Sequence, residues 1–287
     1  MDIDYYKLAQ QMTWQTNENR WDFIRAFLHS VTDSDAAEEI ERFLIFLHES
    51  DGLPRKDKQS LIVLLHGIRT YASWHETFIT HMSKHSDSKV ESIRYDFFDL
   101  ISFIFKKYSK KLQHVTGEIR MLQSRHPDHE IVIAAHSFGT FLTLEFLKAN
   151  PDFKVKRILF CGSVVNPNYK FEEVPNYPGP KQIGNLVGTK DCLPVLASIF
   201  SFGYGPSGTF GFNRNVVVNK KLHCGHSGFF TEKMYDKFWL PFLLNGSFQN
   251  DENEASPHEP SYWMTLLRYS RPLILIGLTI GLLALIV

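Results

Sequence analysis

The spacing of apolar residues changes near residue 60, where short β-rich runs begin. Six runs predict strands, and four of them are continuously apolar, as in parallel strands buried on both faces. The predicted strands cover residues 60–65, 90–95, 130–135, 155–161, 182–188 and 215–219. Segments with helical spacing lie between or after them, at 73–84, 99–124, 138–149 and 231–244. This alternation predicts an α/β fold, an open and mostly parallel sheet flanked by helices.

The first 52 residues follow a different pattern, that of amphipathic helices. Apolar side chains recur at helical spacing around Ile24 and again around Leu44. A Gly-, Pro- and charge-containing stretch at 51–60 predicts a linker. We therefore expect a helical N-terminal extension over 1–52 and a main domain over 58–245. Two uses of the extension stay open, because its apolar face would either cover the main domain or bind a partner protein.

The C-terminal end predicts a membrane anchor. A polar, helix-poor stretch at 246–261 predicts a flexible acidic linker, and the 16 residues after Arg271 carry no charge. As a helix they would be about 24 Å long, somewhat short of the roughly 30 Å hydrocarbon core. We expect an interfacial segment and a C-terminal transmembrane helix over 262–287, and a buried core helix is the alternative.

The residues around this hydrophobic run predict its orientation. Tyr262, Trp263 and Tyr269 are aromatic residues of the kind found at the membrane interface, and Arg268 and Arg271 lie beside them. Basic residues favour the cytoplasmic side, so we expect a single-pass anchor with the catalytic domain in the cytoplasm. The G-x-x-x-G spacing then suggests a homodimer contact through two small residues, Gly277 and Gly281.

Charge and cysteine content exclude some classes of protein. Lys+Arg and Asp+Glu balance at 31 each, but residues 1–51 carry 11 acids and 4 bases, net −7, whereas 52–245 carry 25 bases and 16 acids, net +9. No Arg-rich stripe with interleaved aromatics indicates nucleic-acid binding. The basic cluster at 105–111 is either a solvated helix face or a contact for anionic lipid. The three cysteines predict neither a disulfide framework nor a metal site, and the N-terminus does not resemble a signal peptide.

A serine follows the predicted strand at 130–135 directly. In Ala135-His136-Ser137-Phe138-Gly139, small residues lie two positions before and after Ser137, as a nucleophile on a tight strand-to-helix turn requires. The plainer interpretation is an ordinary serine that starts a helix. We interpret Ser137 as the nucleophile.

A glycine turn follows the strand at 60–65. His66-Gly67-Ile68 permits a bend that would aim the Ile68 amide at an oxyanion, beside the Phe138 amide. A simple turn between strand and helix is the alternative. Two such turns at the carboxyl ends of predicted strands favour a reactive site there.

An acid and two histidines follow later strands. Asp191 would orient an imidazole, although a helix N-cap or an Asx turn before Pro194 would otherwise be the preferred interpretation. Asp96 and Asp99 are rival acids. His226 lies in a glycine-rich loop before the last predicted helix, with His223 as the alternative base. A metal site made by His223, Cys224 and His226 lacks a fourth donor.

The chain order Ser137, Asp191, His226 is that of the α/β-hydrolase triad. From about residue 58 to 245 the sequence resembles α/β-hydrolases, and it is similar to bacterial serine hydrolases with turns like HGIRT (66–70), HSFGT (136–140), GYGPSGTFGF (203–212) and HSGFFT (226–231). The resemblance implies that Ser137 attacks an acyl carbonyl, His226 transfers the proton and Asp191 fixes the imidazole. The Ile68 and Phe138 amides would hold the oxyanion, and the chemistry needs neither a metal nor an organic cofactor.

Three functions fit these observations. The first is a membrane-anchored serine esterase or lipase that cleaves a lipid or acyl ester, with the aromatic loop at 201–214 shaping or covering its acyl pocket. A packed surface loop is the alternative for that segment. The second function is a protein-acyl thioesterase that uses the same triad. The third is a non-catalytic hydrolase fold that binds a partner through residues 1–50.

Overall fold

The computed structural model describes residues 20–32, 34–49, 59–67, 73–86, 88–95, 108–201, 203–248, 259–270, 272 and 276–277. The chain divides into two compact units, Met1–Lys58 and Gln59–Val287. In the first unit, helices α2 (Arg20–His29) and α3 (Ser34–Glu49) pack together, and Ile24, Ile40 and Leu44 are buried. Residues 1–19 of the predicted helical extension and most of the predicted linker lie outside the described residues.

The second unit contains a six-stranded sheet in the order β2-β1-β3-β4-β5-β6, and every pairing is parallel. This confirms the predicted parallel sheet with flanking helices. The strands are β1 (Ser60–Leu65), β2 (Lys89–Ile93), β3 (Glu130–His136), β4 (Arg157–Cys161), β5 (Ile183–Gly188) and β6 (Val217–Leu222).

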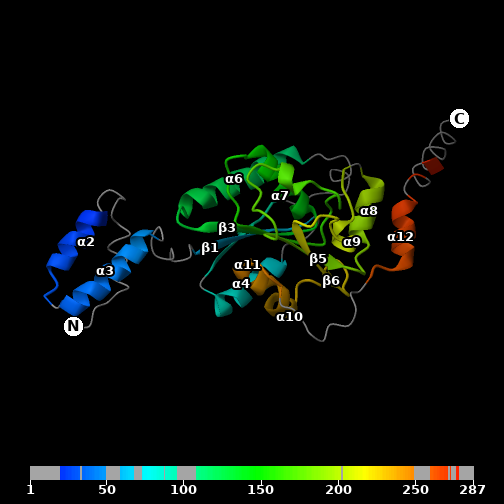
Figure 1. Cartoon of the computed structure of the whole chain (residues 1–287). Coiled ribbons are helices and arrows are strands. Elements are labelled where there is room, and N and C mark those ends of the chain that lie inside the picture. The colour runs from blue at the N-terminus through cyan, green and yellow to red at the C-terminus, as the bar shows by residue number, and fades with distance from the viewer. Residues whose placement is uncertain are drawn as a thin grey trace. The chain divides into compact units, whose positions relative to one another are not determined.

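Helices cover both faces of the sheet (Figure 1). The helical segments of this unit are α4 (Ser73–His85), α6 (Ser109–Arg125), α7 (Phe138–Ala149), η1 (Phe171–Glu173), α8 (Leu193–Phe200), α9 (Ser207–Phe210), α10 (Glu232–Met234), the π-helical η2 (Tyr235–Trp239), α11 (Leu240–Asn245) and α12 (Tyr262–Tyr269). Helices α6 and α7 lie on one side, and α4, α10 and α11 lie on the other. The alternation predicted from apolar spacing is therefore present in three dimensions.

Successive residues of β1 feed two different cores, because side chains alternate across a strand. Leu61, Val63 and Leu65 pack in the core that contains α6 and α7. Ile62 and Leu64 pack in the core that contains α4, η2 and α11. Burial on both faces explains why this strand is continuously apolar.

Predicted boundaries were accurate for β1 and α7 and shifted elsewhere. Strand β6 begins at Val217, two residues after the predicted start, and runs on to Leu222. It is an edge strand paired with β5 alone, so its later polar residues can be half-buried without being apolar. Helix α6 begins at Ser109, because Tyr108 is not helical, and the earlier part of its predicted range lies outside the described residues.

Helix α12, near the C-terminus, packs on other helices of the second unit. Helix α12 contacts α8, its Met264 is buried, and the Arg268 guanidinium lies over the Phe210 ring at 4.9 Å. Within the part of the chain that the structure describes, no helix has the length and apolar character needed to cross a bilayer. The apolar run at 271–287, including Gly281, falls almost entirely outside that part.

Candidate active site

Ser137 occupies a strained turn between β3 and α7. Its backbone angles are φ 54° and ψ −122°, a conformation that non-glycine residues rarely adopt. Its amide donates to the Cys161 carbonyl at the end of β4, and its own carbonyl accepts from the Thr140 amide at 3.0 Å. The hydroxyl of Thr140 donates to the same carbonyl at 2.6 Å. These bonds on both sides hold the turn in place, as strain at a functional serine requires.

The turn needs small neighbours for steric reasons. A Cβ on Gly139 would lie 2.7 Å from the Leu65 carbonyl oxygen, and one on Gly67 would lie 2.6 Å from the Ser137 Cβ. Ala135 is fully buried and opposite Leu65 in the register of β1 and β3. Gly67, which follows β1, therefore lies directly against the serine. Phe138, whose amide is the expected oxyanion donor, is the first residue of α7.

Asp191 and His226 form a direct pair. His226 Nδ1 donates to Asp191 Oδ2 at 2.7 Å, which leaves the lone pair on Nε2, as a general base requires. The side chain of Asp191 is fully buried, and that of His226 is 17% exposed. The other carboxylate oxygen, Oδ1, accepts from the Leu193 amide at 3.0 Å. Asp191 thus makes the Asx turn and also holds the imidazole, with one oxygen for each interaction.

Gly162 connects this pair to the serine. It follows β4 directly after Cys161, the residue whose carbonyl binds the Ser137 amide, and its φ is +54°. A Cβ there would lie 3.0 Å from His226 Nδ1 and 3.2 Å from Asp191 Oδ2. No hydrogen bond joins Ser137 to His226 in the described part of the chain. Such bonds are often long in unliganded enzymes and tighten when substrate binds.

His66 braces the first glycine turn. Its ring stacks on Tyr95 with centroids 3.9 Å apart, and its Nδ1 donates to the Gly67 carbonyl at 2.8 Å. The Tyr95 hydroxyl donates to the His66 carbonyl. Burial lowers the pKa of His66 and raises that of Tyr95, so both groups stay neutral at neutral pH. His66 therefore supports the turn rather than carrying a charge.

Two more buried histidines lie in the same region. His136 Nε2 donates to the His226 carbonyl at 3.0 Å, and the two rings are 4.5 Å apart. Burial lowers the pKa of His136 well below its usual value and that of His75 to about 3. His75 Nδ1 is hydrogen-bonded to the Ser92 hydroxyl. His136 therefore positions the loop that carries His226, while His75 contacts the ring of His66 at 5.8 Å.

The Gly- and aromatic-rich segment after α8 is packed, not an open cover. Tyr204 is buried with its ring 4.8 Å from Phe141, and a Cβ on Gly208 would lie 2.3 Å from the Ser163 amide nitrogen. The Thr209 hydroxyl donates to the Asp191 carbonyl at 2.6 Å. The described residues of 201–214 are therefore packed, and Thr209 holds the backbone of Asp191. A role of this segment in shaping an acyl pocket stays a prediction.

Several residues in the sequence-based predictions are placed elsewhere or not described. Ile68, Asp96 and Asp99 lie outside the described residues, so the second oxyanion donor and the rival acids stay predictions. His223 is exposed, and the Asp191 carboxylate pairs with its rival, His226. Sequence reasoning missed Gly162 and Thr209. A glycine that follows a strand was the available signal for the first, and nothing local indicated the second.

The cysteines near the site are unreactive by their surroundings. Burial raises the pKa of Cys161 well above its usual value and that of Cys224 to about 11. Both thiols are free and stay protonated at neutral pH, so neither is a competing nucleophile.

No described protein family matches the sequence, and no curated protein is significantly similar to it. Solved structures with a similar fold include a predicted CIB-like hydrolase from Thermoplasma acidophilum, with 14% identity over 67% of this chain and 89% of that one at a TM-score of 0.43. An uncharacterised protein from Bacillus cereus covers 85% and 87% of the two chains at 11% identity and a TM-score of 0.46. Carboxyl esterase 2 from Tuber melanosporum covers 63% and 74% at 11% identity and 0.41. All three TM-scores are below 0.5.

Proposed function

We propose that the chain is a serine ester hydrolase of the α/β-hydrolase type, with Ser137 as nucleophile, His226 as general base and Asp191 as the acid that orients it. The observation that carries the proposal is the 2.7 Å Asp191–His226 pair beside a serine at φ 54°. An ordinary helix-starting serine would not need the strained turn or the imidazole beside it. A strained serine, an imidazole base and a buried acid together are the parts that nucleophilic catalysis requires.

The reaction follows from these positions. Ser137 Oγ attacks the acyl carbonyl as its proton passes to His226 Nε2, and Asp191 stabilises the imidazolium that forms. The Phe138 and Ile68 amides hold the oxyanion of the tetrahedral intermediate. His226 then protonates the leaving alcohol, which leaves an acyl-enzyme on Ser137. Water activated by the same imidazole hydrolyses that ester and restores the serine.

Exposed apolar side chains beside the site favour a lipid or long-chain acyl ester. Leu193, two residues after Asp191, and Phe200 at the other end of α8 are both 48% exposed. Helix α12, which contacts α8, exposes Trp263 to 51% and Leu266 to 53%. Exposed apolar side chains on two helices in contact, one of which begins just after Asp191, are typical of a surface that meets lipid. The hydrophobic run at 271–287 supports the same proposal, because an anchor there would hold the enzyme at a cytoplasmic membrane surface.

The catalytic proposal is tested by labelling the full chain with a fluorophosphonate probe. Rapid labelling should be lost in Ser137→Ala and reduced by at least about 10³-fold in His226→Ala, because an unassisted serine is a poor nucleophile. His223→Ala is the matched control, an adjacent histidine that should leave labelling within about twofold. Equal loss in both histidine variants would contradict the assignment of the base. A folded wild type that does not label would favour a non-catalytic binding protein.

The lipid proposal is tested with Trp263→Ser/Leu266→Ser in the full chain and a series of esters of increasing acyl length. Loss of this apolar face should reduce turnover of vesicle-borne long-chain esters by about tenfold, because less apolar surface is buried at the bilayer. Turnover of a short, soluble ester is the internal control and should not change. Equal effects on both substrates, or a wild type that cleaves short esters alone, would contradict a lipid substrate.

A further inference from the structure

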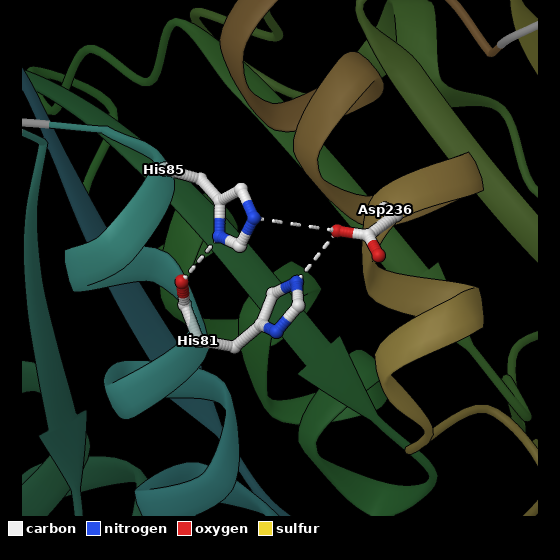
Figure 2. A group of neighbouring side chains, drawn as sticks. All are labelled: His81, His85 and Asp236. Carbon is white, nitrogen blue, oxygen red and sulfur yellow. Dashed lines mark hydrogen bonds and ion pairs between the residues drawn. The ribbon is translucent and has the colours of Figure 1, made fainter.

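Three side chains from the end of α4 and from η2 form a second polar cluster (Figure 2). His81 and His85 lie four residues apart on α4, and Asp236 lies on η2. His81 Nε2 is 2.7 Å from Asp236 Oδ1, and His85 Nε2 is 4.0 Å from the same oxygen. One ligand atom from each residue lies within 4.8 Å of the other two.

This cluster is separate from the triad. The beginning of α4 is near the active site, where the Trp74 ring lies 6.4 Å from the His136 ring. His81 follows Trp74 by seven residues, which is about 10 Å along a helix. The proposed hydrolysis does not use any of the three side chains.

The His85 imidazole is already held in the orientation that a ligand needs. Its Nδ1 donates to the His81 carbonyl at 2.8 Å, and its other ring nitrogen, Nε2, faces Asp236 (Figure 2). A histidine that binds a metal usually donates its other ring N–H to a carbonyl or carboxylate in this way.

A simple ion pair explains only part of this arrangement. The 2.7 Å contact between His81 and Asp236 is a normal hydrogen bond and accounts for two of the three side chains. It leaves His85 Nε2 at 4.0 Å from the same carboxylate oxygen, which is too far for a hydrogen bond. A cation between the three atoms would displace the proton of His81 Nε2 and be coordinated by all three side chains.

The distances are close to those of a tetrahedral site. Zinc–ligand bonds of about 2.0–2.1 Å place neighbouring ligand atoms about 3.3 Å apart. The 2.7 Å separation would have to widen and the 4.0 Å separation to narrow, each by less than about 1 Å. The side chains of His85 and Asp236 are 44% and 55% exposed, so they can move and leave room for a water ligand.

We propose that His81, His85 and Asp236 bind one divalent transition-metal ion, for which Zn²⁺ has the best-matched chemistry. Two imidazoles and one carboxylate suit Zn²⁺, with water in the fourth position, whereas Ca²⁺ and Mg²⁺ require mostly oxygen ligands. The ion would join α4 to η2, two segments whose Trp74, Tyr235 and Trp239 pack together in one core. Its role is to clamp the helices behind the active site.

The test measures binding of Zn²⁺ and Co²⁺ to the chelator-treated full chain, by calorimetry and by thermal unfolding. We expect one ion per chain and a rise in Tm of about 5–10 °C at a free Zn²⁺ concentration of one hundred times Kd. His85→Ala and Asp236→Ala change exposed side chains, so both variants should fold. Each should weaken Zn²⁺ binding by at least about tenfold and remove most of the thermal shift.

A double His126→Ala/His129→Ala variant is the matched control. These rings form another close pair, with centroids 5.2 Å apart, and they are not part of the cluster. Their removal should leave the affinity for Zn²⁺ within about twofold, and tetrahedral Co²⁺ absorption should remain. Absence of stoichiometric binding, or binding that survives His85→Ala and Asp236→Ala, would overturn the proposal.

Discussion

The second unit contains two histidine–aspartate pairs with the same 2.7 Å separation and different surroundings. Asp191 is fully buried and bonds His226 through Nδ1, whereas Asp236 is 55% exposed and bonds His81 through Nε2. The first pair lies beside a strained serine, and the second lies beside another histidine. The distance alone therefore does not identify what a pair does.

Burial and the choice of ring nitrogen separate the two chemistries. A buried carboxylate on Nδ1 fixes one tautomer and leaves Nε2 to accept a proton. An exposed carboxylate bonded to Nε2 blocks that nitrogen as a base. It also brings an anionic oxygen to 4.0 Å from His85 Nε2, so that one carboxylate and two imidazoles are available to a cation.

Gly162→Ala should break the first pair. The new Cβ would lie 3.0 Å from His226 Nδ1, so the imidazole must move by a few tenths of an ångström. A misplacement of about 1 Å costs on the order of 10²-fold in rate, so we expect a loss of about tenfold. The positive φ should also cost about 1–2 kcal/mol of stability. Gly179→Ala is the control, because its φ is +94° and a Cβ there meets no atom within 4 Å. Ester hydrolysis that falls equally in both variants would mean that strain, not displacement of His226, is the cause.

Burial of His75, near the beginning of α4, should make stability depend on pH. The pKa of His75 is lowered to about 3 by burial, from a usual 6.5, so below pH 6.5 the unfolded chain binds a proton that the folded chain does not. The contribution of His75 to the free energy of unfolding is then fully present above pH 6.5 and falls by up to about 1.4 kcal/mol per pH unit on acidification. Urea unfolding between pH 7 and pH 4 measures this slope, and His75→Gln should reduce it. An unchanged slope would show that His75 is not the titrating group.

Asp191→Asn should leave the second pair intact. The affinity of the His81–His85–Asp236 cluster for Zn²⁺ should stay within about twofold of wild type. His81 lies about 10 Å along α4 from Trp74, which is near the active site, and the cluster shares no side chain with the triad. Calorimetry on the chelator-treated variant makes the comparison. A large loss of affinity would mean that the two pairs form one coupled network.

The sequence predicted the sheet well because burial constrains it strongly. Strand β1 is apolar along its whole length and α7 is bounded by the serine turn, so both were placed to the residue. Strand β6 was misplaced by two residues because an edge strand tolerates polar residues such as Lys220 and Lys221, and periodicity then gives no clear end.

The candidate site was predictable where chemistry follows a strand end, and not where it depends on close approach. Ser137, Asp191 and His226 each follow a predicted strand, so their order indicated a triad. Gly162 and Thr209 act through contacts with residues 18 to 64 positions away, which no local pattern records. The H-x-x-x-H spacing of His81 and His85 was visible in the sequence, but Asp236 comes 151 residues later and only the fold brings it close.

The central claim is that the buried Asp191–His226 pair activates Ser137, and the labelling rate of Asp191→Asn tests it most directly. The matched control is Asp152→Asn, which removes a charge paired with Arg120 near the opposite end of α7. We predict that fluorophosphonate labelling of Ser137 falls by about 10⁴-fold in Asp191→Asn, because the imidazole loses its correct tautomer. In Asp152→Asn the rate should stay within about twofold of wild type. Labelling of Ser137 in Asp191→Asn at the wild-type rate would contradict the account.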